Sequence, residues 1–135
     1  MTDFTVLAER ASALLDAHHQ AKPVVLPTVW DAWSAGAMVE AGFTALTIGS
    51  HPLADSLGYA DGENMPLEEA LDGIARITSS VDVPVSADLE SGYDTDAPDL
   101  IAGLLEAGAV GLNIEDTVHS AGRLRTAEEH AEYIG

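Results

Sequence analysis

The sequence predicts an α/β protein built on a parallel sheet. Short β-rich runs alternate with amphipathic stretches of helical period, the β-rich runs are apolar almost throughout, and 47% of the 135 residues are hydrophobic. Strands joined by helical crossovers must run parallel, and a parallel sheet needs both faces covered. Four such units fit either a small doubly wound sheet or one half of a (β/α)₈ barrel, which typically takes about 250 residues. The pattern alone leaves both architectures open.

The first half of the chain predicts two helices, two strands and a long loop. Apolar residues recur at three- and four-residue spacing over residues 4–18, which is typical of an amphipathic helix. The apolar run at 24–26 predicts the first strand. Asp31 is a favourable N-cap residue for a second helix, and residues 45–48 predict the second strand. A loop with three glycines is expected over 49–65, and loops of this length are usually functional.

The second half repeats the alternation and ends in a helical pattern. Pro66 suits the start of a third amphipathic helix, and the apolar run at 83–87 predicts the third strand. Asp96 opens the next helix, and residues 110–114 predict the fourth strand. Near Thr126, a Thr-x-x-Glu capping box marks the start of the last helix. We therefore take residues 1–135 as one domain.

The composition argues against several classes of function. With 23 acidic and 5 basic residues, the formal net charge is -18, which repels the phosphate backbone of nucleic acids. The absence of cysteine excludes disulfides and thiolate chemistry. No apolar run reaches the roughly 18 residues of a membrane span, and the start of the chain lacks the pattern of a signal peptide. We expect a cytoplasmic protein that binds neither nucleic acid nor membrane.

Acidic residues gather just after the predicted strands. Asp88 and Glu90 end the third strand, Glu115 follows the fourth strand, and Asp61 follows the second. The two-residue spacing of Asp88 and Glu90 predicts that their side chains share one face of the strand. The carboxyl ends of parallel strands meet at one edge of a sheet, where ligands bind. Crowded carboxylates repel one another, and a divalent cation relieves this repulsion. Oxygen ligands favour Mg²⁺ or Mn²⁺ over zinc, while solvated helix caps are the alternative interpretation.

Four motifs, in chain order, resemble those of the isocitrate lyase/phosphoenolpyruvate mutase superfamily. Residues 27–32 (PTVWDA) resemble its first strand and turn, often P-N-x-W-D-A, and residues 56–62 (SLGYADG) resemble its S-x-G-x-x-D loop. Residues 88–93 (DLESGY) are similar to the D-x-D/E-x-G-Y metal motif, and residues 111–116 (GLNIED) to the G-x-x-x-E-D strand. The resemblance covers essentially the whole chain and favours the phosphoenolpyruvate mutase-like branch.

The resemblance implies the N-terminal half of a (β/α)₈ barrel, with about four parallel strands and an extra N-terminal helix. It implies a lyase or phosphonomutase that uses Mg²⁺, or Mn²⁺, to form or cleave a C–C or P–C bond next to the carbonyl of a small 2-oxo acid or phosphonate. Asp88 would bind the metal directly, and Glu90 and Glu115 would hold its water shell. The implied roles are catalysis for Asp61 and Glu115, metal binding for Asp88, Glu90 and Glu115, and substrate binding for Thr47, Gly49, Ser50 and His51.

The sequence departs from the family in three places, of which one is the turn at residues 49–51 (GSH), which differs from the Ser-Gly common in mutases and lyases. Family lyases carry a cysteine acid/base in a loop after the fourth strand, but residues 118–123 hold none, which argues against an isocitrate or methylisocitrate lyase. The chain also ends at Gly135, before the four further βα units that the family has. We expect either a truncated enzyme or a homo-oligomer in which two copies complete a barrel. The alternative is a non-catalytic remnant that serves as a binding or assembly module.

Overall fold

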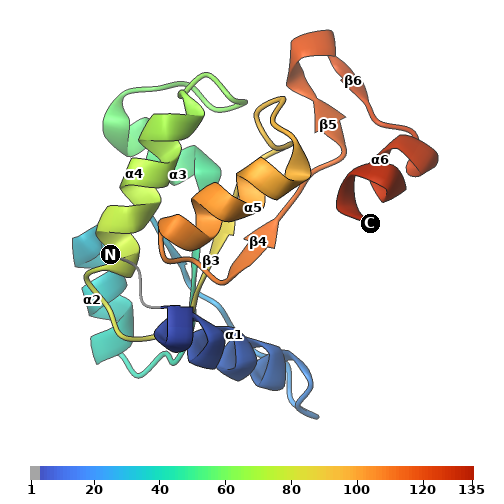
Figure 1. Cartoon of the computed structure of the whole chain (residues 1–135). Coiled ribbons are helices and arrows are strands. Elements are labelled where there is room, and N and C mark those ends of the chain that lie inside the picture. The colour runs from blue at the N-terminus through green and yellow to red at the C-terminus, as the bar shows by residue number, and fades with distance from the viewer. Residues whose placement is uncertain (1–3) are drawn as a thin grey trace.

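The computed structural model describes residues 4–135 and confirms the α/β class (Figure 1). Four parallel strands form one sheet in the order β1-β2-β3-β4, namely β1 (Thr28–Val29), β2 (Leu46–Ile48), β3 (Val85–Asp88) and β4 (Gly111–Asn113). The helices are α1 (Phe4–His18), α2 (Ala32–Glu40), α3 (Ser50–Leu57), α4 (Leu67–Thr78), α5 (Ala97–Glu106) and α6 (Ala127–Ile134). After β4 comes an antiparallel hairpin of β5 (Thr117–Val118) and β6 (Arg123–Leu124), with the 3₁₀ helix η1 (His119–Ala121) between its strands.

Each strand of the main sheet pairs with its neighbour in the sequence. Thr47 lies opposite both Thr28 and Ser86, and Asp88 lies opposite Asn113. Helices α2, α4 and α5 lie within the successive connections, as parallel pairing requires. The carboxyl ends of all four strands therefore lie at one edge of the sheet, which is the edge where the sequence predicts the site.

The core lies between the sheet and the helices of the crossovers. Ile74 and Ile77 of α4 and Leu100 and Leu104 of α5 are almost completely buried, and each such side chain contributes about 1.5–3 kcal/mol by its burial. Helix α1 lies across the end of the sheet opposite the hairpin (Figure 1). Within residues 4–135, no helix is long and apolar enough to cross a membrane.

Local capping signals in the sequence are confirmed at two helices. The Asp31 carboxylate accepts a hydrogen bond from the Ser34 amide, and the Ser34 hydroxyl accepts one from the Asp31 amide. These two bonds complete a capping box at the start of α2. The Ser34 amide bond lowers the pKa of the Asp31 carboxyl. Thr126 and Glu129 form the second box at α6. Glu129 also accepts two hydrogen bonds from Arg123, which lower its pKa to about 2 and join α6 to the hairpin.

The predicted first strand is misplaced by a few residues. Residues 24–26 are not part of the sheet, and β1 comprises Thr28–Val29. The amide of Thr47 donates to the Pro27 carbonyl at 3.1 Å, so pairing with β2 begins only at Pro27. The position of the strand is therefore fixed by its register with β2 and not by the apolar character of residues 24–26.

The predicted long loop and the loop after β4 are both more regular than expected. Residues 50–57 of the expected 49–65 loop form α3, which Gly58 ends in a left-handed conformation with φ of 85°. The helix buries Leu53 and Ala54 against the core, and this tertiary packing outweighs its weak local signals. Residues 117–124, which were expected to be loop, form the β5–β6 hairpin. The third and fourth strands and the starts of α4 and α5 are confirmed to within two residues.

Both outer strands of the main sheet have an unpaired edge. Within residues 4–135, strand β1 pairs only with β2, and β4 pairs only with β3. Large apolar side chains are exposed on the flanking helices, with Trp33 of α2 79% exposed and Ile134 of α6 62% exposed. A cavity of about 340 Å³ lies between α5, α6 and β4, with Leu112 and Ile114 in its wall. Exposed edges and apolar surface of this kind favour association.

We expect this chain to associate in solution because the two edges offer unpaired backbone groups and apolar side chains. Light scattering coupled to size-exclusion chromatography should give a mass above 14.1 kDa that rises with concentration. The substitution Trp33→Ser should lower that mass. The matched control is Leu57→Ser on α3, a helix that packs against α4. A monodisperse monomer at every concentration would contradict the expectation.

Candidate functional site

The pairing of β3 with β4 brings the predicted carboxylates to one edge of the sheet. Asp88 is the last residue of β3 and lies opposite Asn113, the last residue of β4. Pairing continues past both strands, because the Leu89 amide donates to the Asn113 carbonyl at 3.3 Å and the Glu115 amide donates to the Glu90 carbonyl at 2.7 Å. Glu90 and Glu115 are therefore neighbours across this extended pairing.

The Asp88 carboxylate is oriented by two hydrogen bonds. The Ser50 hydroxyl donates to Oδ2 at 2.8 Å, and the Glu90 amide donates to Oδ1 at 3.0 Å. Ser50 is the first residue of α3, so the first bond connects this helix to the predicted metal motif. Each carboxylate oxygen retains a further lone pair, which leaves Asp88 able to bind a cation.

Glu90 is the most enclosed of the predicted site residues, with only 3% of its surface exposed. Its Oε2 accepts a hydrogen bond from the Glu63 amide at 2.7 Å, and its Oε1 accepts one from the Tyr93 hydroxyl at 3.4 Å. Burial raises the pKa of the Glu90 carboxyl, the Glu63 hydrogen bond opposes this rise, and the negative charge of Asp61 adds to it. The site therefore holds a carboxyl group whose charged form is disfavoured by its surroundings.

The predicted shared face of Asp88 and Glu90 does not follow from strand alternation. Strand β3 ends at Asp88, and Glu90 has φ of 48°, in the left-handed region, so the period of two does not extend to it. The Gly92 amide donates to the Leu89 carbonyl at 2.9 Å and closes a turn there. This turn directs the Glu90 side chain toward Glu63.

His119 lies between Glu90 and Glu115. Its Nε2 is 3.4 Å from Glu90 Oε2 and 3.8 Å from Glu115 Oε2. This nitrogen is buried and makes no hydrogen bond of good geometry. The two carboxylates therefore approach one point, at which the imidazole of η1 stands.

The predicted substrate-binding turn follows β2. The Thr47 amide donates to the Pro27 carbonyl at 3.1 Å and the Gly49 amide to the Val29 carbonyl at 3.3 Å, so the sheet already uses both amides. Ser50 and His51 lie in the first turn of α3, where amides have no acceptor within the helix. Of the four predicted residues, Ser50 and His51 are thus the two whose amides are suited to bind an anion.

The predicted catalytic residue Asp61 lies beside His51. Asp61 Oδ2 is 3.3 Å from His51 Nδ1, and Asp55 Oδ2 is 3.2 Å from His51 Nε2. All three side chains are at least half exposed, so these pairs contribute little to stability. The contact nevertheless places Asp61 next to the substrate-binding turn, and the Asp61 charge raises the pKa of Glu90.

The arrangement of the carboxylates suits a hydrated cation. Among residues 4–135, no three His, Cys, Asp or Glu side chains are close enough together to hold a metal ion directly. Mg²⁺ usually keeps several waters and binds through one or two carboxylates. The chemistry of the carboxylate oxygens of Asp88, Glu90 and Glu115 is compatible with this mode of binding.

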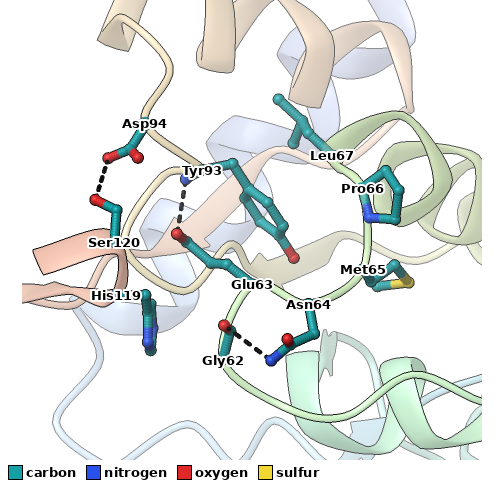
Figure 2. Close-up of a pocket in the computed structure, with 10 residues that line it drawn as sticks. All are labelled: Gly62, Glu63, Asn64, Met65, Pro66, Leu67, Tyr93, Asp94, His119 and Ser120. Atoms are coloured by element: carbon teal, nitrogen blue, oxygen red, sulfur yellow. Dashed lines mark hydrogen bonds between the residues drawn. The ribbon is translucent and has the colours of Figure 1, made fainter. Parts of the chain in front are cut away.

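A cleft of about 510 Å³ opens beside Glu63 and His119 (Figure 2). Its walls are the loop 62–67, the turn residues Tyr93 and Asp94, and His119 and Ser120 of η1. None of the predicted site residues, all of which lie in the described range, lines this cleft. His119 borders both the cleft and the two glutamates, so the cleft lies next to the predicted site without containing it.

Three residues of this region are missing from the sequence-based prediction. Glu63 directly follows the loop motif at residues 56–62 but has no signal of its own, and His119 is recognisable only as the residue four positions after Glu115. Arg125 donates to the carbonyls of Ser91 and Glu115, at 2.8 and 3.0 Å. Its role in holding the two loops together depends on tertiary structure and has no local signature.

The four parallel strands with their crossover helices, and the acidic residues at the carboxyl edge, define the class as a parallel α/β fold. Residues 14–135 match the phosphoenolpyruvate phosphomutase family. The chain belongs to this family, and its relatives include members of the phosphoenolpyruvate mutase/isocitrate lyase superfamily. The predicted family and fold are therefore confirmed.

Solved structures and curated relatives support this assignment. The structure of a proposed phosphonomutase of Burkholderia cenocepacia has a TM-score of 0.87 and 40% identity, over 93% of this chain and 52% of that chain. The structure of a 2,3-dimethylmalate lyase has a TM-score of 0.81 and 25% identity, and the match covers 93% of this chain and 45% of that chain. The 2-methylisocitrate lyase of Escherichia coli is 34% identical over 82 residues, which are 58% of this chain and 28% of that enzyme.

This chain spans about half the length of the matched structures and less of the curated relatives. It is 39% identical over 103 residues to an uncharacterised protein of Mycobacterium tuberculosis, and the match covers 76% of this chain and 39% of that protein. The four parallel strands with their helices thus correspond to about half of the TIM barrel of this superfamily.

The substitution Glu90→Gln should raise the free energy of unfolding near pH 7 in Mg²⁺-free buffer. A carboxyl group whose folded-state pKa lies above its ordinary value of 4.5 destabilises the fold at neutral pH. This penalty fades as the pH falls through the raised pKa and is absent below the ordinary value. Urea unfolding at several pH values should therefore show a gain that is largest at neutral pH. The exposed control Glu68→Gln should show no such trend, and a Glu90→Gln protein less stable than the parent at pH 7 would contradict the expectation.

Proposed function

We propose that this chain carries the acidic part of the active site of a lyase or phosphonomutase that depends on Mg²⁺ or Mn²⁺. The reaction would form or cleave a C–C or P–C bond next to the carbonyl of a small 2-oxo acid or phosphonate. The observation that carries the proposal is that Glu90 and Glu115 both approach one point, at His119 Nε2, while Asp88 ends β3 two residues before Glu90. Membership of the phosphomutase family supports the type of bond chemistry.

The metal would be held by three side chains with different tasks. Asp88, oriented by Ser50, would be the direct ligand, and Glu90 and Glu115 would accept hydrogen bonds from the water around the ion. When bound, Mg²⁺ supplies positive charge that stabilises the negative charge developing on the carbonyl oxygen of the substrate. The second task of Glu115, as a catalytic group, is supported by its exposed carboxylate at the edge of the site.

The substrate would bind at the turn formed by Thr47, Gly49, Ser50 and His51. The free amides of Ser50 and His51, at the N-terminus of α3, would bind the carboxylate of a 2-oxo acid. With a net charge of -18 on the chain, an anionic substrate needs such local donors in addition to the metal. Asp61, beside His51, would then lie near the leaving or transferring group.

The absence of cysteine narrows the range of reactions that we propose. Family lyases use a cysteine acid/base after the fourth strand, and this chain has none, so we do not propose an isocitrate or methylisocitrate cleavage. Residues 117–124 form a hairpin there, and it places His119 next to Glu115. We propose a cytoplasmic location for the protein, with a small-molecule substrate, self-association, and neither nucleic acid nor membrane as a partner.

A second candidate is a non-catalytic module that binds or assembles. The observation that favours it is the open edge at β1 and at β4, in a chain that spans about half the length of its structural relatives. In this version the acidic site would remain able to bind a cation, but no turnover would follow.

Calorimetric titration with Mg²⁺ tests the metal site. We expect the parent to bind Mg²⁺ and Asp88→Asn to bind it at least about tenfold more weakly, because the direct carboxylate ligand becomes a neutral amide. The matched control is Asp72→Asn, which removes one exposed carboxylate from α4. Equal affinity in the parent and in Asp88→Asn would refute the site.

An activity screen separates the two candidate functions. If the Mg²⁺-loaded chain is catalytic, we expect it to act on oxaloacetate or phosphonopyruvate, with 2-methylisocitrate as the compound that should not react, and the rate should fall with Asp61→Asn and with EDTA. Tight Mg²⁺ binding without turnover of any of these compounds would favour the non-catalytic module. The product assay is ¹H and ³¹P NMR of each reaction.

A further inference from the structure

We propose that Glu63 is a positioning residue that holds the turn after β3, so that Glu90 faces Glu115. This inference rests on the metal site of the proposed function and adds a residue that no sequence motif singles out. Glu63 lies in the connection between α3 and α4, 27 positions before Glu90. We call Glu63, together with its partners Glu90, Ser91 and Tyr93, the Glu63 clamp.

A single oxygen of Glu63 holds the turn at three points. Its Oε1 accepts hydrogen bonds from the Ser91 amide at 3.1 Å, from the Ser91 hydroxyl at 2.7 Å and from the Tyr93 amide at 2.7 Å (Figure 2 shows the last). Hydrogen bonds to an ionised carboxylate are stronger than those between neutral groups. The side chain of Glu63 therefore fixes the backbone of the turn.

The contact also runs in the opposite direction. The amide of Glu63 donates to Oε2 of Glu90 at 2.7 Å, so the backbone of Glu63 fixes the carboxylate of Glu90. A residue that served only to anchor the loop would not need this bond. Because it ends on a predicted metal-site carboxylate, the Glu63 clamp joins the loop that carries Asp61 to the residues that would hold the metal's water.

The Glu63 clamp coincides with the unusual backbone of the molecule. Four non-glycine residues of the described part of the chain have positive φ: Glu63 at 58°, Glu90 at 48°, Tyr93 at 55° and Asp94 at 49°. Three of them belong to the clamp and the fourth is adjacent. Such conformations are unfavourable for side chains with a Cβ atom and persist only where surrounding contacts enforce them. The four hydrogen bonds of the clamp are contacts of this kind.

Release of the turn would disturb the metal site in a defined way. The Glu90 carbonyl accepts the Glu115 amide, so a relaxed turn separates the two carboxylates. Groups that orient the residues around a metal typically change its affinity 10- to 100-fold when they are removed. Glu63 should therefore affect cation binding without touching the cation.

Three variants of the full chain test this role by Mg²⁺ calorimetry and by amide exchange measured with NMR. Glu63→Ala should weaken Mg²⁺ binding by about 10- to 100-fold and speed the exchange of the Ser91 and Tyr93 amides. Glu63→Gln keeps an acceptor oxygen and should restore most of both properties. Glu68→Ala removes a carboxylate from the exposed face of α4 and should match the parent.

Each outcome decides the proposal. Unchanged exchange in Glu63→Ala overturns the clamp, and faster exchange with parental Mg²⁺ affinity overturns its positioning role. Equal losses of affinity in Glu63→Ala and Glu68→Ala reduce the effect to net charge and also overturn it. Should Glu63→Ala fail to fold, Ser91→Ala removes one of the three donors, and parental affinity and exchange in that variant would count against the clamp.

Failure of the proposed function is distinguishable from failure of this inference. If the parent binds no Mg²⁺ and Asp88→Asn changes nothing, the metal site fails. The exchange of the Ser91 and Tyr93 amides in Glu63→Ala then decides alone whether Glu63 holds the turn.

Discussion

The hydrogen bond from the Glu115 amide to the Glu90 carbonyl extends the pairing of β3 and β4 beyond the strands themselves. Parallel pairing already places both strand ends at one edge, but Glu90 lies two residues past β3 in a left-handed conformation. Together with the bond from the Leu89 amide to the Asn113 carbonyl, this bond makes Glu90 and Glu115 neighbours. The pairing of these two glutamates therefore depends on backbone geometry in a turn.

The electrostatics of the region follow from this geometry. Bringing carboxylates together in a partly buried place disfavours their charged forms, as the raised pKa of Glu90 reflects. Two donors oppose this effect, the Glu63 amide and the Tyr93 hydroxyl, and the imidazole of His119 lies 3.4 Å from Glu90 Oε2. Burial, followed by the charges of Glu90 and Glu63, raises the pKa of the Tyr93 phenol, so its hydroxyl keeps its proton and remains a donor. A buried carboxyl surrounded in this way is one that a cation would stabilise further.

Local and sheet-level signals in the sequence predicted most of the fold. The caps at Asp31 and Thr126 act within four residues, so their sequence signatures are sufficient, and Asp88 followed from the rule that functional residues stand at strand ends. Helix α3 was missed because tertiary burial of Leu53 stabilises it more than its local propensity does. The Glu63 clamp spans 27 to 30 positions, and no periodicity or cap reports on contacts at that separation.

The hydrogen bonds that orient the acidic site all come from within residues 50–125, although the chain corresponds to about half of its structural relatives. Ser50 orients Asp88, Glu63 orients Glu90, and Arg125 holds the carbonyls of Ser91 and Glu115. The geometry of the carboxylates therefore does not require strands beyond β4, whereas enclosure of a substrate would require something to cover the open edges of β1 and β4. In the proposed function, cation binding and turnover would for this reason be separable, since the first would depend on contacts that the chain contains and the second on covering the surfaces that it leaves exposed.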